Sequence, residues 1–153
     1  MPWLASDPIR IIVPGTPKPL PRNRHRIMNR KGGGAQFVVN YMPPEAAKEQ
    51  SSIRWIANQA MGGRAPLDGA VDLRVVAFMP IPASWSRRKQ AAALADQIRP
   101  TGRPDADNIV KLLKDCLSGV VLRDDAIITD MAMWKRFSDR PRLLVEVRSL
   151  TWV

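Results

Sequence analysis

Residues 107–119 read DNIVKLLKDCLSG, and this stretch carries the clearest helical pattern in the chain. Its apolar residues recur at the spacing of one helix face, at Ile109, Leu112, Leu113, Cys116 and Leu117. Gly119 follows directly and is predicted to end the helix. We therefore expect an amphipathic helix packed on a core, with Cys116 as a buried packing residue. Because Cys116 is the single cysteine, no intramolecular disulfide can form, which is typical of a reducing compartment.

Strands are predicted on both sides of this helix. β-branched or alternating runs bounded by turn residues predict them at residues 9–13, 36–40, 70–80, 127–137 and 143–147. We expect the 36–40 strand to pair back on the first strand, and the last two strands to form a hairpin that turns at residues 139–141.

Two further helices are predicted between the strands. Pro43-Pro44 opens one that runs to about Met61, where Gly62-Gly63 stops it. Ser84 is expected to cap the other, over residues 85–97. The interleaved elements predict an α/β (α+β) fold, with one compact domain over residues 1–153 and a mixed sheet flanked by helices. Trp55, Trp85 and Trp134 are expected in its core, although Trp85 as a wedge against an unpaired base is the alternative.

The charge of the chain points to a polyanionic partner. The formal net charge is +10, which draws a protein to nucleic acid. A flexible basic loop is predicted at about residues 18–35, where His25 is expected to bind phosphate among the cations Lys18, Arg22, Arg24, Arg26, Arg30 and Lys31. A second basic set comprises Arg87, Arg88, Lys89 and Arg103. A merely solvated basic surface is the alternative for both.

Membrane insertion is not expected. No apolar run approaches the roughly 20 residues that span a bilayer, and the N-terminus lacks a signal-peptide layout. We expect a cytoplasmic protein.

Acidic residues gather in two places of this basic chain, as Asp105 with Asp107 and as Asp124 with Asp125. If residues 105–107 are extended, Asp105 and Asp107 point the same way and can face one ion. The alternative is that Asp107 caps the helix and Asp105 is a favourable charge near its dipole. Lys111 lies one turn after Asp107, where it either serves the site or forms a surface pair.

A metal site is predicted if the return after Gly119 brings the second acidic pair beside the first. Three converging carboxylates repel one another unless a cation lies between them, and Mg²⁺ takes carboxylates, water and phosphate. The sequence lacks the glycine and glutamate positions of an EF-hand, and a zinc site is excluded because it has one histidine and one cysteine. It also lacks a Ser-His-Asp triad and a phosphate-binding loop.

These residues resemble the RusA family of Holliday junction resolvases. The resemblance rests on RPDADN at residues 103–108, Lys111, Asp115, Gly119, RDDA at residues 123–126 with Ile127-Ile128, and Lys135. It also includes PGTPKP at residues 14–19 and residues 80–89, which are similar to phage-type members. The glycine-rich basic loop lies outside this resemblance, so its contact with DNA is predicted from charge alone.

The resemblance implies a function and a set of site residues. Asp105, Asp107 and Asp125 match the metal-binding catalytic aspartates, and Lys111 matches the catalytic lysine. Asp124 and Asn108 are expected beside them in a supporting role. The resemblance further implies a mixed-sheet homodimer that uses Mg²⁺ or Mn²⁺ and resolves four-way junctions by paired symmetric nicks during DNA recombination and repair. A two-fold junction needs two equivalent sites, so dimerisation also follows from geometry.

Two rival functions remain open at this point. A non-catalytic nucleic-acid-binding protein shares the charge but needs no converging aspartates. A transferase that uses Asp-x-Asp to hold a metal-bound diphosphate needs a nucleotide-sugar pocket, for which a short basic chain leaves little room.

Overall fold

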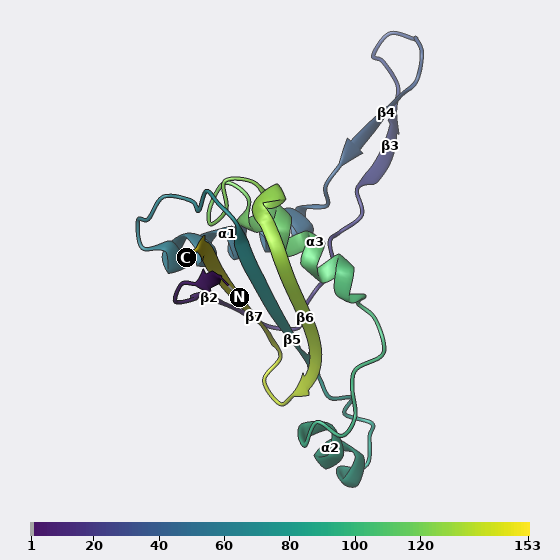
Figure 1. The fold of residues 1–153 in the computed structure, drawn as a ribbon. Helices are drawn as coiled ribbons and strands as arrows, with labels where there is room; N and C mark the ends of the chain where they lie inside the picture. The colour runs from purple at the N-terminus through teal and green to yellow at the C-terminus, as the bar shows by residue number, and fades with distance from the viewer. Residues whose placement is uncertain (1) are drawn as a thin grey trace.

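The computed structural model describes residues 2–153 and shows a mixed sheet with two helices on one face (Figure 1). The sheet contains β1 (Trp3–Ala5), β2 (Ile9–Pro14), β5 (Val71–Pro80), β6 (Ile128–Ser138) and β7 (Arg142–Trp152). Strand β5 lies between β6, which is parallel to it, and β7, which is antiparallel. Both β1 and β2 pair with the far edge of β7. The predicted α+β class with a mixed sheet is confirmed.

Helices α1 (Pro44–Met61) and α3 (Ala106–Leu117) cover the same face of the sheet. Alternate residues of β2, β5 and β7 are buried there against one side of each helix. Helix α1 begins with Pro44 and ends at Gly62, whose φ of 56° lies in the left-handed region that glycine favours. Cys116 is buried on α3, as predicted, and this burial raises the pKa of its thiol to about 11.

The basic segment contains a strand, which corrects the prediction of a loop. Strand β3 (Arg24–Met28) pairs antiparallel with β4 (Phe37–Tyr41) in a two-stranded sheet separate from the main one. The 36–40 strand therefore forms, but its partner is β3 and not the first strand, which pairs with β7. Local closure favours this pairing, since β3 and β4 are joined by a short connection.

The predicted hairpin of the last two strands is also wrong. Strands β6 and β7 flank β5, so the connection at residues 139–141 crosses the end of β5. The central place goes to β5 because its residues are the most apolar of the three, and it contributes five buried apolar side chains: Val71, Leu73, Val75, Ala77 and Met79. Strand β1 was not predicted at all.

Helix starts differ slightly from the predictions. Helix α2 (Arg87–Leu94) is capped by Ser86 rather than Ser84, and the Ser86 hydroxyl accepts a hydrogen bond from the Lys89 amide. Helix α3 has Asp105 and not Asp107 at its N-cap position. Within residues 2–153, no helix is long and apolar enough to cross a membrane.

The tryptophans are less buried than predicted. Trp55 is 65% exposed because it lies two residues after the buried Ile53, on the opposite side of α1. Trp134 is 37% exposed on the edge strand β6. Trp85 is half-buried, and its ring packs edge-on against Phe137 with 5.2 Å between ring centroids.

Candidate active site at the start of helix α3

Two carboxylates stand at the N-terminus of α3. Asp105 occupies the N-cap position with extended backbone angles, and its side chain makes no capping hydrogen bond. Asp107 lies in the first helical turn with 67% of its side chain exposed. The unpaired amides of a helix N-terminus attract negatively charged groups, so acidic side chains are common at this position. The predicted extended run is wrong, since Asp107 is helical, but the two acids remain neighbours.

Lys111 contacts Asp107 and also lines a hollow in the surface. Its Nζ lies 3.3 Å from Oδ2 of Asp107, one turn apart on the helix. Such an exposed pair adds only about 0.3–0.5 kcal/mol to helix stability, so the pair by itself is a weak structural feature. Lys111 also lines the hollow beside Asp105, which is where a bound phosphate would meet it.

The hollow lies between the start of α3 and the beginning of the basic segment. Its walls are Pro19, Leu20, Pro21, Arg22, Arg103, Pro104, Asp105, Asn108 and Lys111. The Leu20 amide donates a 3.1 Å hydrogen bond to the carbonyl oxygen of Asn108, which ties the two segments together. The site therefore combines one free carboxylate with three nearby cations: Arg22, Arg103 and Lys111.

The second acidic pair lies by a later part of α3. Asp124 caps the short 3₁₀ helix η1 (Asp125–Ile127), where its Oδ1 accepts a 2.7 Å hydrogen bond from the Ala126 amide. Asp125 pairs with Lys114 at 3.6 Å. Lys114 lies seven residues after Asp107, which is about 10 Å along a helix axis.

Asp105 and Asp107 both lie at the start of α3, whereas Asp125 pairs with Lys114 in the last turn of the helix. Among the residues described, no three Asp, Glu, His or Cys side chains are grouped closely enough to hold a metal ion. The predicted convergence of three carboxylates is therefore not seen. The return after Gly119 buries Val121 and Leu122 near the end of α3, so η1 meets the helix there and not at its start.

Lys135 is a residue of this region for which the sequence predicted no role. It projects from the helix-covered face of β6, and its Nζ donates a hydrogen bond to the carbonyl oxygen of Gly102. Gly102 lies three residues before Asp105, so β6 fixes the loop that leads to the site. The signal in the sequence was a lysine between the apolar residues Met133 and Phe137, which pack against the core from the same face.

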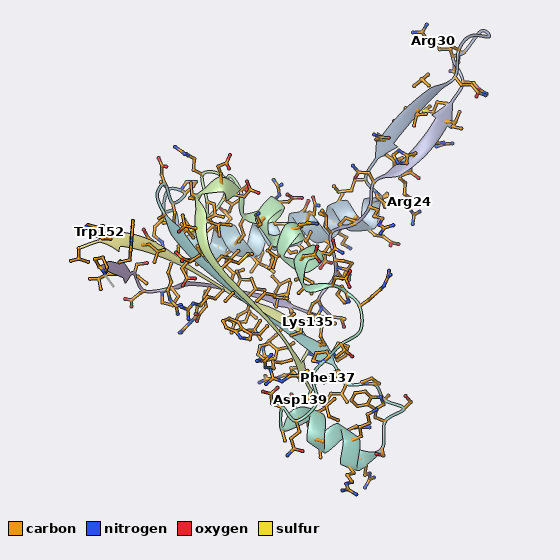
Figure 2. All side chains as sticks on the ribbon, turned by 45° about the vertical axis from the view of Figure 1, so that its right-hand side comes forward. Arg24, Arg30, Lys135, Phe137, Asp139 and Trp152 are labelled. Atoms are coloured by element: carbon orange, nitrogen blue, oxygen red, sulfur yellow. The ribbon has the colours of Figure 1, made fainter. Side chains whose placement is uncertain are left out.

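Apart from Arg22 and Arg103, which line the hollow, most of the predicted DNA-binding cations lie in two other regions. Arg24, Arg26, Arg30 and Lys31 belong to the β3–β4 hairpin, which projects away from the body of the molecule (Figure 2). Lys18, at the base of this segment, pairs with Glu49 at 3.1 Å. Arg87, Arg88 and Lys89 form the first turn of α2, where the Lys89 ammonium lies 3.9 Å from the centre of the Trp85 ring. Arg103 connects the regions, because it lines both the Asp105 hollow and a second hollow beside Trp85 and Phe137.

Comparison with known proteins identifies the family of this chain. The family described as "Endodeoxyribonuclease RusA" matches residues 14–148, which include the site, the hairpin and most of the sheet. The chain is also 32% identical over 149 residues to the "Uncharacterized protein YqaN" of Bacillus subtilis (strain 168), and the match covers 95% of this chain and 99% of that protein. The chain belongs to the RusA endodeoxyribonuclease family.

Proposed function

We propose that this protein is a metal-dependent endodeoxyribonuclease that resolves four-way DNA junctions in recombination and repair. The observation that carries the proposal is the free Asp105 carboxylate beside Asp107 at the N-terminus of α3, in a hollow that also contains Lys111. An acidic pair flanked by cations is suited to a phosphodiester, whose charge the cations offset. Membership of an endodeoxyribonuclease family supports DNA as the substrate.

The donor set fits Mg²⁺, with Mn²⁺ as a substitute. Mg²⁺ is commonly held by one or two carboxylates together with water and substrate phosphate, and not by a cage of protein ligands. Asp105 and Asp107 would hold it, and neither carboxylate is consumed in helix capping. Asp125 remains the third candidate ligand, supported by the resemblance of RDDA at residues 123–126 and not by proximity. When bound, the ion supplies Lewis-acid polarisation of the phosphate and activation of a water.

The other residues of the hollow would orient the scissile phosphate. Lys111 carries three donors and no acceptor, so it can bind a phosphate oxygen while it remains beside Asp107. Arg22, on the basic segment, and Arg103, in the loop before Asp105, both line the hollow. They would hold the DNA backbone in register without reading bases. Asn108 anchors Leu20 through its backbone, and Asp124 shapes η1, so both act as supports.

We also propose that the protein acts as a homodimer, joined through the sheet face opposite α1 and α3. One apolar side chain from each of four adjacent strands forms a continuous row there, because Ile12 pairs with Leu144, Leu144 with Val76, and Val76 with Trp134. Ile12 is 53% exposed and Trp134 37% exposed. Such a row suits the apolar centre of an interface.

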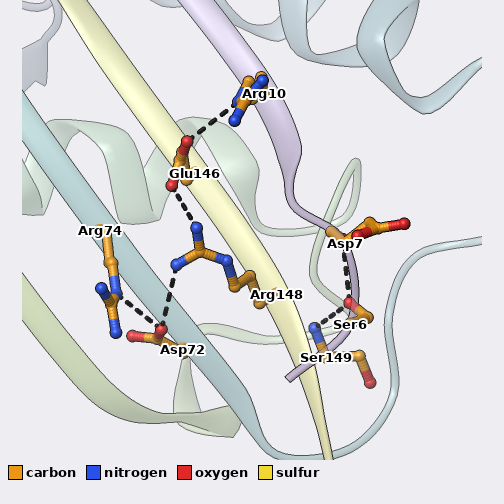
Figure 3. A network of polar contacts seen from close by, with 8 residues as sticks. All are labelled: Ser6, Asp7, Arg10, Asp72, Arg74, Glu146, Arg148 and Ser149. Atoms are coloured by element: carbon orange, nitrogen blue, oxygen red, sulfur yellow. Dashed lines mark hydrogen bonds and ion pairs between the residues drawn. The ribbon is translucent and has the colours of Figure 1, made fainter. Parts of the chain in front are cut away.

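The arginines beside this row are each paired with an acidic side chain. Figure 3 shows Arg10 paired with Glu146, Glu146 with Arg148, and Asp72 with both Arg148 and Arg74. Two copies of a chain with a net charge of +10 repel each other, so a face whose arginines are paired with acids is a favourable place for them to meet. A second copy is therefore the partner that this face suits, and it provides the second active site that a two-fold junction needs.

A cleavage assay with matched four-way, flap and linear duplex substrates tests the function. We expect paired symmetric nicks in the four-way junction with Mg²⁺ and none with EDTA. The rival is a non-catalytic DNA-binding protein. In that case the ion pairs of Asp107 and Asp125 with lysines would have only a structural role. That rival is favoured if all substrates are bound and none is cut with either Mg²⁺ or Mn²⁺.

A further inference from the structure

The β3–β4 hairpin is an arm separate from the main sheet. Within residues 2–153 its two strands pair only with each other, and Arg24 at its base and Arg30 near its tip show how far it projects in Figure 2. All five residues of β3 are exposed, as are four of the five in β4. A two-stranded hairpin alone is marginally stable in water, so an arm of this kind is suited to stabilisation by a partner.

The register of the hairpin gives it two different faces. Arg24 pairs with Tyr41, Arg26 with Val39, and Met28 with Phe37, and alternation places these six side chains on one side. We call this side the basic-aromatic face. The opposite face carries His25 paired with Asn40 and Ile27 paired with Val38, and a hydrogen bond joins His25 Nδ1 to Asn40 Oδ1.

The charge of the arm selects the partner. Residues 18–41 contain six lysines and arginines and neither aspartate nor glutamate, so the arm is suited to a polyanion. Charge alone would favour any DNA equally, because phosphate contacts carry no information on sequence or branching.

The aromatic residues of the arm offer a way to recognise branching, which charge alone does not provide. Phe37 is 45% exposed and Tyr41 is 40% exposed, and each stands beside a cation or a flexible apolar side chain on the same face. Exposed aromatics beside arginines are the arrangement on which proteins stack nucleobases. In an intact duplex the base faces are covered by their neighbours. They become accessible at the branch point of an opened junction.

We propose that the basic-aromatic face stacks on bases at the branch point of junction DNA, with Arg24 and Arg26 on the flanking phosphates. The inference rests on the proposed function, since it takes branched DNA as the substrate. It goes beyond that function because it gives the arm the recognition of branching, separately from the hollow at Asp105. Side chains that enter between bases and open the stack provide the physical precedent.

The test compares two double variants of the full-length protein in EDTA, so that cleavage does not contribute. Phe37→Ala with Tyr41→Ala alters the basic-aromatic face, and Ile27→Ala with Val38→Ala alters the opposite face as a matched control. For the first variant we expect junction affinity to fall roughly 5- to 160-fold, the range for loss of one stacked base, with little change for linear duplex. The control should bind both DNAs as the parent does. Because the arm lies outside the core, both variants should unfold at the parent temperature.

A second readout reports the bases directly. A junction with 2-aminopurine at the branch point should change in fluorescence with the parent and the control, but not with the aromatic variant. Equal losses for junction and duplex, equal effects of the two variants, or no loss in either would overturn the proposal. Binding to anionic phosphatidylserine vesicles that depends on Phe37 and Tyr41, with DNA binding unchanged, would overturn it in favour of a membrane.

Failure of the nuclease proposal looks different from failure of this one. If no Mg²⁺-dependent cleavage occurs but the fluorescence change requires Phe37 and Tyr41, the arm binds branched DNA and the catalytic assignment is wrong. If the aromatic variant cuts and binds junctions as the parent does, the catalytic assignment stands and the arm has no such role.

Discussion

The ammonium group of Lys135 on β6 donates a hydrogen bond to the carbonyl oxygen of Gly102, in the loop that leads to Asp105. This contact crosses from the main sheet to the start of α3, so it positions the site without belonging to it. We predict that Lys135→Met lowers kcat on junctions about tenfold, with a smaller change in KM, because the loop loses its anchor. A single hydrogen bond contributes about 1 kcal/mol, so the fold should persist. Partial recovery in Lys135→Arg would support positioning, whereas unchanged kcat in Lys135→Met would exclude it.

Neutralising the aspartates should separate cleavage from binding. We expect Asp105→Asn and Asp107→Asn to abolish Mg²⁺-dependent cleavage of four-way junctions while junction affinity stays equal or rises, because the site then repels phosphate less. The substitution Asp125→Asn is the most informative, since Asp125 pairs with Lys114 and lies apart from the other two. Loss of cleavage there supports a third ligand.

A matched control exists for that experiment. Asp68 is also exposed and paired with a cation, with its Oδ1 3.1 Å from Arg123. Asp68→Asn should therefore cut at the parent rate. Full activity in all three site variants would show that the hollow is not the catalytic centre.

The comparison between sequence and structure separates local from non-local information. The spacing of Ile109, Leu112 and Leu113 predicted α3 because helical periodicity is a local property. The order of β5, β6 and β7 could not be predicted, since pairing partners are set by competition for the buried centre of the sheet. Strand β3 was not predicted because all of its residues are exposed. Since neither face is buried, its sequence does not show the alternation of apolar and polar residues that indicates a half-buried strand.

In the candidate site, too, the local features were predictable from the sequence and the non-local ones were not. Asp105 and Asp107 are neighbours because they are two residues apart, which needs no knowledge of tertiary structure. The position of Asp125 depends on the path of residues 118–123, which packs Val121 and Leu122 into the core. No periodicity in the sequence records that path.

Salt should weaken DNA binding steeply, because cations on the arm release counterions from the phosphates they contact. We predict that Arg24→Gln and Arg26→Gln each reduce the slope of log affinity against log salt by about 0.9 on linear duplex. Lys18→Gln should have a smaller effect, since Lys18 is already paired with Glu49. Titrations by fluorescence anisotropy at several salt concentrations measure these slopes, and a flat response for the parent would remove the arm from DNA binding.

The Cys116 thiol offers a probe of the core and of pH dependence. Burial raises its pKa to about 11 from an ordinary value of 9.0, so the folded state disfavours the thiolate. A raised pKa contributes stability that is complete below pH 9 and is lost as pH rises towards 11. We expect Cys116 to resist a thiol reagent at pH 8 until denaturant unfolds the chain. Rapid labelling of the native protein would contradict its buried position.

The apolar row on the helix-free face gives a test of dimerisation that does not involve the active site. Ile12→Arg places a charge in the row, beside Leu144. In a dimer, the second copy would bury this charge without a partner. We predict that this variant elutes as a monomer in light-scattering chromatography, while the parent elutes as a dimer of about twice 17.1 kDa. Met131→Arg is the control, because Met131 is 55% exposed on the other face of β6 and its substitution should leave the dimer intact.

The monomeric variant should still nick one strand of a junction but lose the paired second cut, since each copy retains its own hollow. A monomeric parent, or dimers that Met131→Arg disrupts and Ile12→Arg does not, would place the interface elsewhere.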